Sequence, residues 1–253
     1  MNIISRSFKT IYTSNILRKT IHLTLSLILI IPFSQPYREF MNTLLSYSLD
    51  PTLLTMVILL FTAAFINSLQ IRVPNLRDRF IHVLGDIRKK FLSSLETVVK
   101  GNTDILENID KMFSRYEERL IDIISSVERS YELRYGYICV TFALLSITIS
   151  YVLFSHVAVY GILALGIVDA LSSIISMSTQ TRRKFLKHTD LSILTTFTIF
   201  TVLIYTLNWN IINSITLSFV AITVELLSPE DNLTLPIAVS LVAYVMDVPL
   251  PNI

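Results

Sequence analysis

The chain of 253 residues is poor in the residue types that build several common sites. Its one cysteine, Cys139, lies in an apolar run, which excludes a disulfide framework and a cysteine-rich metal site. Glycine is scarce, with 5 residues, and the glycine-rich phosphate loops of P-loop proteins and of protein kinases are both missing. Charged residues make up only 16% of the chain and the net charge is +2, so no basic face for nucleic acid is expected.

Apolar residues fill most of the remaining sequence. They make up 52% of the chain, and the mean hydropathy is +0.61, whereas soluble domains carry about 25% charge. The charge is also unevenly placed, because 12 of the 21 Lys and Arg and 11 of the 19 Asp and Glu lie within 72–134. This composition predicts an integral membrane protein with one hydrophilic insertion.

The long apolar runs predict an all-α, multi-pass membrane protein. A spanning helix needs about 20 mostly apolar residues. About seven segments qualify, and we expect them to form one integral membrane domain over 1–253. They lie near 17–34, 52–70, 136–155, 156–178, 191–208, 210–228 and 233–250.

Lysine and arginine predict the orientation of these spans. They are concentrated before the first span and in the loops after the second and fourth spans, and they are absent from the loops after the third and fifth. Positively charged loops stay on the cytoplasmic side. We therefore expect a cytoplasmic N-terminus and a multi-pass cell-membrane protein, or an endoplasmic-reticulum protein if the source is a eukaryote.

The insertion 72–134 has helical periodicity. One apolar stripe runs from Leu84 to Val98 and another from Ile105 to Ile123, each with spacings of three and four. Between them, 100–104 reads Lys-Gly-Asn-Thr-Asp, a helix breaker followed by capping residues. The pattern predicts a cytoplasmic helical hairpin between the second and third spans.

Ionisable groups stand inside or at the edges of the apolar runs, where they are costly and indicate function by default. Arg18, Lys19 and His22 share one helical face at the start of the first span. Asp169 begins a polar stripe on the fourth span that continues through Ser172 and Ser176. The cations also suit a positive-inside anchor and the serines suit helix packing, but an isolated carboxylate in lipid needs a cation or a proton.

Two further clusters follow the fourth span. A basic loop contains Arg182, Arg183 and Lys187, a pattern that serves either as a topology signal or as a phosphate clamp. Glu225 ends the sixth span, and Asp231 with Asn232 opens the seventh. A plain loop with Asp231 as an N-cap would explain the last pair, but it would not explain a glutamate in an apolar helix.

These clusters all map to the cytoplasmic side in the predicted topology. Carboxylates hold Mg²⁺, which also binds substrate phosphates, and cations neutralise the remaining phosphate charge. The combination predicts a site for a nucleotide phosphate and a metal. Its place at the lipid boundary predicts that the second substrate is a membrane lipid.

The same residues, in this order, resemble a known set. Arg18-Lys19-x-x-His22, Asp169-Ala170-x-Ser-Ser, Lys187-x-x-Asp190-x-Ser192, and Glu225 followed by Asp231-Asn232-Leu-Thr-x-Pro236 are similar to motifs of the CTP-dependent lipid kinases. This family comprises dolichol (polyprenol) kinases, phytol kinases and the fungal-type diacylglycerol kinase. The resemblance covers the first span and residues from about 130 onward.

The resemblance implies an enzyme that transfers the terminal phosphoryl group of CTP to a polyprenol, with Mg²⁺ as cofactor. It implies that Asp169, Glu225 and Asp231 bind the metal or orient the lipid hydroxyl, with Asp169 and Asp231 as catalytic candidates. His22 would position a phosphate or assist proton transfer. The expected nucleotide- and phosphate-binding residues are Arg18, Lys19, Arg182, Arg183, Lys187 and Asn232.

Other functions stay open at the level of sequence. A lipid cytidylyltransferase also uses CTP, Mg²⁺ and a membrane lipid, and the acceptor of a kinase can equally be diacylglycerol or phytol. A non-catalytic membrane paralogue is a further alternative. A transporter is disfavoured, because transporters place polar groups near the bilayer middle and often contain internal repeats. The oligomeric state is not predicted.

Overall fold

The computed structural model describes residues 2–45, 49–73, 76–99, 103–127, 138–179 and 187–250. The described residues form helices and turns without strands, as the sequence predicts for an all-α chain. Contacts divide the chain into two units, Met1–Phe65 with Ile138–Ile253, and Ile66–Tyr137. The candidate site lies wholly in the first unit.

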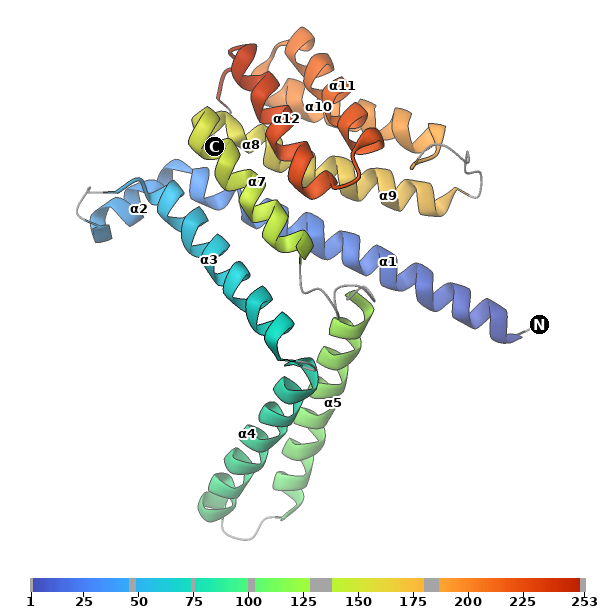
Figure 1. Cartoon of the computed structure of the whole chain (residues 1–253). Helices are drawn as coiled ribbons and strands as arrows, with labels where there is room; N and C mark the ends of the chain where they lie inside the picture. Colours follow the sequence, from blue (N-terminus) through green and yellow to red (C-terminus); the bar gives the residue numbers. More distant parts are fainter. Residues whose placement is uncertain are drawn as a thin grey trace. The chain divides into compact units, whose positions relative to one another are not determined.

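The first unit is a bundle of apolar helices (Figure 1). Among the described residues of the whole chain, four segments are long and apolar enough to cross a membrane, namely Asn15–Phe33, Pro51–Arg72, Ile138–Ser178 and Asp190–Asn208. Two shorter apolar helices follow them, Ile211–Leu227 and Asp231–Val245. The described helices of the unit are α1 (Asn2–Ile28), α2 (Gln35–Leu45), α7 (Ile138–Phe154), α8 (Ala158–Leu163), α9 (Asp169–Ser178), α10 (Asp190–Asn208), α11 (Ile211–Leu227) and α12 (Asp231–Val245). Helix α3 (Pro51–Arg72) belongs to this unit up to Phe65 and to the second unit from Ile66.

Helix α12 lies at the centre of the packing. It contacts α7, α8 and α11, while α10 contacts α9 and α11, and α1 contacts α9 (Figure 1). The largest fully buried apolar side chains include Tyr160, Phe200, Leu217 and Leu235, contributed by α8, α10, α11 and α12. This packing brings the start of α9, the end of α11 and the start of α12 close to α1.

The long apolar segment 138–178 reverses direction at a short turn. Helix α7 ends at Phe154, and a 3₁₀ turn follows over Ser155–Val157. Its first residue, Ser155, has a left-handed backbone with φ of 58°. The turn packs against aromatic rings, with the His156 ring centroid 5.5 Å from Tyr151 and 6.5 Å from Phe33. The sequence places its third and fourth spans on either side of this point.

Helix α12 ends earlier than the predicted span 233–250. Its last residue is Val245, and Asp247 has a left-handed backbone with φ of 49°. The N–H of Val248 bonds to the carbonyl of Ala243 and the N–H of Asp247 to that of Tyr244, at 3.0 and 3.1 Å. This pair of bonds is a Schellman motif, which satisfies carbonyls at a helix end. The apolar residues after Val245 therefore lie outside α12, although their hydropathy placed them in the predicted span.

Pro236 lies within α12 and leaves one backbone carbonyl without its helical donor. Proline has no N–H, so the carbonyl of Asn232, four residues earlier, loses its usual partner. The hydroxyl of Ser146 on α7 donates to that carbonyl at 2.8 Å. A buried serine of α7 thus completes the first turns of α12, which carry Asp231 and Asn232.

Gly166 permits the close approach of α1 to the segment before α9. A Cβ at this position would lie 2.7 Å from the Cβ of Ser26, closer than real side chains come. Residues Ala164–Val168 form a turn of π-helix that leads directly into Asp169, and such turns are frequent at functional sites. The missing side chain and the π-turn together set the position of Asp169 against α1.

We predict that Gly166→Ala destabilises the protein, because Ser26 and the backbone of α1 must move to admit the methyl group. Overpacking of this kind costs about 1–3 kcal/mol. The matched control is Gly85→Ala in α4, where an added Cβ meets nothing within 4 Å and the exchange stabilises a helix by about 0.5–1 kcal/mol. Thermal unfolding in detergent measures both, and a Gly166→Ala variant as stable as Gly85→Ala would contradict the close contact.

The second unit contains α4 (Leu76–Val99) and α5 (Thr103–Val127), which pack against each other. The guanidinium of Arg88 bonds to Glu117 at 2.6 Å and to the hydroxyl of Ser114 at 2.7 Å. The rings of Phe91 and Phe113 meet edge to face at 5.9 Å. These contacts pair earlier residues of α4 with later ones of α5, so the helices run in opposite directions.

Candidate functional site

Asp169 is buried at the start of α9 and is held by two side chains of α1. Its Oδ1 accepts from the Lys19 ammonium, and its Oδ2 lies 3.0 Å from Nδ1 of His22. Only 2% of Asp169 is exposed, and Lys19 is buried as well. Lys19 and His22 are three residues apart and so lie on the same face of α1, where the sequence predicts a cationic cluster.

Glu225 is fully buried near the end of α11. Its Oε1 lies 2.9 Å from Nε2 of His188 and 3.2 Å from Nζ of Lys187. Its Oε2 is buried and has no hydrogen-bond partner among the described residues. A buried carboxylate oxygen without a donor is costly, and this oxygen is therefore the one that remains available to a ligand.

Asp231 is the first residue of α12 and is the most exposed of the three carboxylates. Its Oδ2 accepts from the Lys187 ammonium, and its Oδ1 accepts from the N–H of Asn232 at 2.9 Å. Burial lowers the pKa of Lys187, but the Glu225 and Asp231 carboxylates outweigh burial and raise that pKa above its ordinary value. Lys187 thus remains a cation that bridges two carboxylates.

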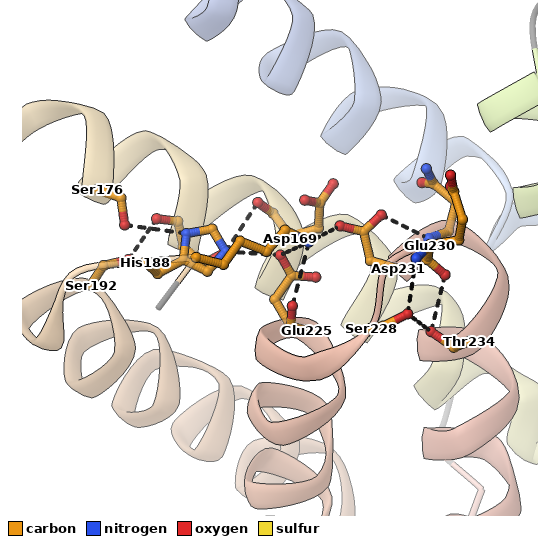
Figure 2. A network of polar contacts seen from close by, with 12 residues as sticks. Asp169, Ser176, His188, Ser192, Glu225, Ser228, Glu230, Asp231 and Thr234 are labelled. Atoms are coloured by element: carbon orange, nitrogen blue, oxygen red, sulfur yellow. Dashed lines mark hydrogen bonds and ion pairs between the residues drawn. The ribbon is translucent and has the colours of Figure 1, made fainter. Parts of the chain in front are cut away.

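The three carboxylates converge on one point. Asp169, Glu225 and Asp231 each offer an oxygen, and these oxygens lie within 4.8 Å of one another. Figure 2 shows the three side chains directed towards a common region, with His188 on the side of Glu225 that is away from Asp231. Each of the two buried carboxylates carries one lysine and one histidine as partners, so Lys19 with His22 and Lys187 with His188 flank the cluster.

His188 belongs to this network, although the sequence did not mark it as a site residue. Its ring is buried between α9 and α11, with Nδ1 3.2 Å from the hydroxyl of Ser176 and Nε2 3.2 Å from that of Ser172. The hydroxyl of Ser192 on α10 donates to the carbonyl of Ser172 at 2.6 Å. The signal that could have found His188 is the serine stripe after Asp169, since a polar stripe on a buried helix requires a polar partner.

Four further residues were predicted for the site, namely Arg18, Arg182, Arg183 and Asn232. Arg182 and Arg183 lie outside the described residues. Arg18 is half-buried on α1, next to Lys19. Asn232 is buried, and its backbone contacts both Asp231 and Ser146. The structure therefore brings together Lys19, His22, Asp169, Lys187, Glu225 and Asp231. The catalytic, metal-binding and nucleotide-binding roles of these residues stay predictions, as do those of Asn232 and the three arginines.

The site is accessible through its less buried members. The side chains of His22, Asp231 and Lys187 are 25%, 17% and 37% exposed, whereas those of Asp169 and Glu225 are 2% and 1% exposed. A ligand would therefore meet Lys187, Asp231 and His22 first and the buried carboxylates last.

The donor set is chemically compatible with a hard divalent cation. Mg²⁺ takes six oxygens at about 2.0–2.1 Å, which places ligand oxygens about 3–4.2 Å apart. A spread of 4.8 Å needs only a small closure. The unpartnered Oε2 of Glu225 is the oxygen that such an ion would satisfy, and both oxygens of Asp169 already have partners in α1.

Comparison with known proteins gives no relative for this chain, since no family model, no curated protein and no solved structure matches it. The class of protein is therefore defined by the fold and the site alone. Over the described residues it is an all-helical chain with four helices apolar enough to cross a membrane and a partly buried cluster of carboxylates, lysines and histidines.

Proposed function

We propose that the chain is a CTP-dependent polyprenol kinase, which converts CTP and a polyprenol into polyprenyl phosphate and CDP. The observation that carries the proposal is the meeting of Asp169, Glu225 and Asp231 with two lysines and two histidines within an apolar helical bundle. Carboxylates for a metal and cations for phosphates are the two requirements of phosphoryl transfer. The apolar surroundings select a lipid as the acceptor.

The proposal includes a membrane topology of seven crossings with the N-terminus in the cytoplasm. The turns at Ser155–Val157 and Asn208–Asn210 divide the apolar segments into the required number. The shorter helices α11 and α12 are 17 and 15 residues long, which corresponds to about 25 and 22 Å at 1.5 Å per residue. Both are supported by packing against longer helices. The unit containing α4 and α5 would then belong to the cytoplasmic side.

In the proposed reaction the oxygen of the lipid hydroxyl attacks the γ-phosphorus of CTP. The bond from this phosphorus to the bridging oxygen breaks, CDP leaves, and the hydroxyl proton passes to a carboxylate of the cluster. Lys19 and Lys187 neutralise phosphate oxygens. His22, whose Nδ1 faces Asp169, donates from Nε2 to one of these oxygens when both of its ring nitrogens carry a proton. Most of the rate comes from this positioning and charge neutralisation.

The three carboxylates take different roles in this proposal. Glu225 and Asp231 would hold Mg²⁺, which when bound would withdraw charge from the triphosphate. Asp169 holds Lys19 and His22 in place, because it is almost fully buried and its two oxygens face these two side chains of α1. Asp231 also has a partner at each oxygen, but it is more exposed, and its lysine is shared with Glu225. Of the three carboxylates, Glu225 alone combines full burial with an oxygen that has no partner among the described residues.

The test is an assay of the purified full-length chain in lipid nanodiscs. CTP, ATP, GTP and UTP, each labelled at the γ-phosphate, are offered with polyprenol, phytol and diacylglycerol in the presence of Mg²⁺. We expect label from CTP in polyprenyl phosphate, with CDP as the second product. Release of pyrophosphate would instead identify a cytidylyltransferase, and label in phytol or diacylglycerol would change the acceptor. No transfer from any nucleotide would refute the kinase.

A further inference from the structure

We infer that His188 is a positioning residue that holds Glu225 with one oxygen saturated and the other directed to a divalent cation. The inference rests on the proposed function for its biological meaning, but it concerns a contact within the chain. His188 lies in the segment between α9 and α10, outside every motif residue that the sequence singles out for the site.

The contacts of His188 join the two helices that carry the buried carboxylates. The two serines that face the imidazole, Ser172 and Ser176, lie on α9 below Asp169, and Glu225 lies on α11. The backbone N–H of Thr189 donates to the hydroxyl of Ser176 at 3.1 Å, so that hydroxyl can donate its own proton to Nδ1. This leaves Nε2–H as the donor to Oε1 of Glu225.

His188 is a rigid neighbour of Oε1 of Glu225, and it therefore determines whether Oε2 is free to bind a cation. A glutamate carboxylate rotates easily about its last torsion, and rotation would exchange the two oxygens. The planar ring of His188 is only 3% exposed and is fixed by two serines, whereas the ammonium of Lys187 is also shared with Asp231. His188 therefore holds the orientation in which Oε2 has no donor among the residues that the structure describes. Hydrogen bonds of this kind behind a metal ligand alter metal affinity about 10–100-fold.

Two amides test this geometry because each replaces one nitrogen of the ring. In His188→Gln the amide nitrogen reaches the place of Nε2 and can still donate to Glu225. In His188→Asn the shorter amide reaches only the place of Nδ1, so the contact with Ser176 remains and Glu225 loses its donor. If His188 only stabilised the fold, His188→Gln would not bind a divalent cation more tightly than His188→Asn.

The experiment measures binding of Mn²⁺ alone to the full-length chain in nanodiscs, by the electron paramagnetic resonance signal of the free ion. We expect His188→Asn to weaken Mn²⁺ binding about 10–100-fold, and His188→Gln to restore most of it, at equal thermal stability. In the CTP assay, His188→Asn should raise the Mg²⁺ concentration needed for half-maximal rate more than it lowers the maximal rate.

Three outcomes would overturn the inference: no Mn²⁺ binding by the wild type, equal affinity of His188→Asn and wild type, or equal loss in His188→Gln and His188→Asn. The proposed function is judged separately. If Mn²⁺ binding depends on His188 as expected but CTP transfers no phosphoryl group, the positioning role stands and the kinase is refuted. If CTP donates its phosphoryl group but Mn²⁺ binding does not depend on His188, the kinase stands and the positioning role is refuted.

Discussion

Asp231→Asn is expected to reduce phosphoryl transfer from CTP about 10³-fold, because a metal that neutralises the transferred phosphate contributes several kcal/mol to the transition state. The amide keeps the shape of the side chain, and its oxygen can still accept from the N–H of Asn232. It lacks the charge needed for a metal and for Lys187. The rate is measured with the γ-labelled CTP assay under saturating Mg²⁺ and polyprenol.

Glu230→Gln is the matched control for this variant. Glu230 immediately precedes Asp231, is exposed, and engages the following turn through its backbone carbonyl (Figure 2). The exchange removes the same single charge at almost the same place, so a general electrostatic effect would appear in both variants. Equal activity of Asp231→Asn and Glu230→Gln would remove Asp231 from the site.

The helical elements could be predicted largely from the sequence, because apolar runs and their interruptions determine them. Helix α3 covers Pro51–Arg72 against a predicted 52–70, and α11 covers Ile211–Leu227 against 210–228. The end of α12 was predicted wrongly, because the Schellman turn at Asp247 depends on backbone hydrogen bonds that hydropathy does not register. The π-turn before Asp169 is likewise a result of packing.

The sequence identifies several residues that meet in the cluster, but it does not show which of them contact one another. Charge in an apolar helix marks Lys19, His22, Asp169 and Glu225 individually. Their pairing depends on tertiary contacts, since Lys19 and Asp169 are 150 residues apart. His188 was missed, because a histidine beside lysines in a loop resembles a solvated segment and the serine stripe on α9 was not connected with it. Its burial against α9 follows only from the path of the chain.

Lys19→Met is expected to destabilise the folded protein by about 3–5 kcal/mol, because it leaves a buried carboxylate without its main counter-charge. Asp169 would retain only the contact with His22, at 3.0 Å, while remaining almost fully buried. The loss is measured as a shift of the denaturant midpoint in detergent, with helix content as the readout. Lys111→Met is the control, since Lys111 pairs with Glu107 on the exposed surface of α5, and such pairs contribute only about 0.3–0.5 kcal/mol.

The double variant Lys19→Met/Asp169→Leu distinguishes a buried ion pair from a general need for Lys19. Replacement of both partners by apolar residues removes the uncompensated charge, and such exchanges are often neutral or stabilising. We therefore expect the double variant to be more stable than Lys19→Met while having no phosphoryl transfer, because Lys19 and the anchor of His22 are both gone. If it is less stable than Lys19→Met, Asp169 stabilises the bundle through contacts other than its pair with Lys19. If it retains full transfer, the roles of Lys19 and Asp169 in the site are wrong.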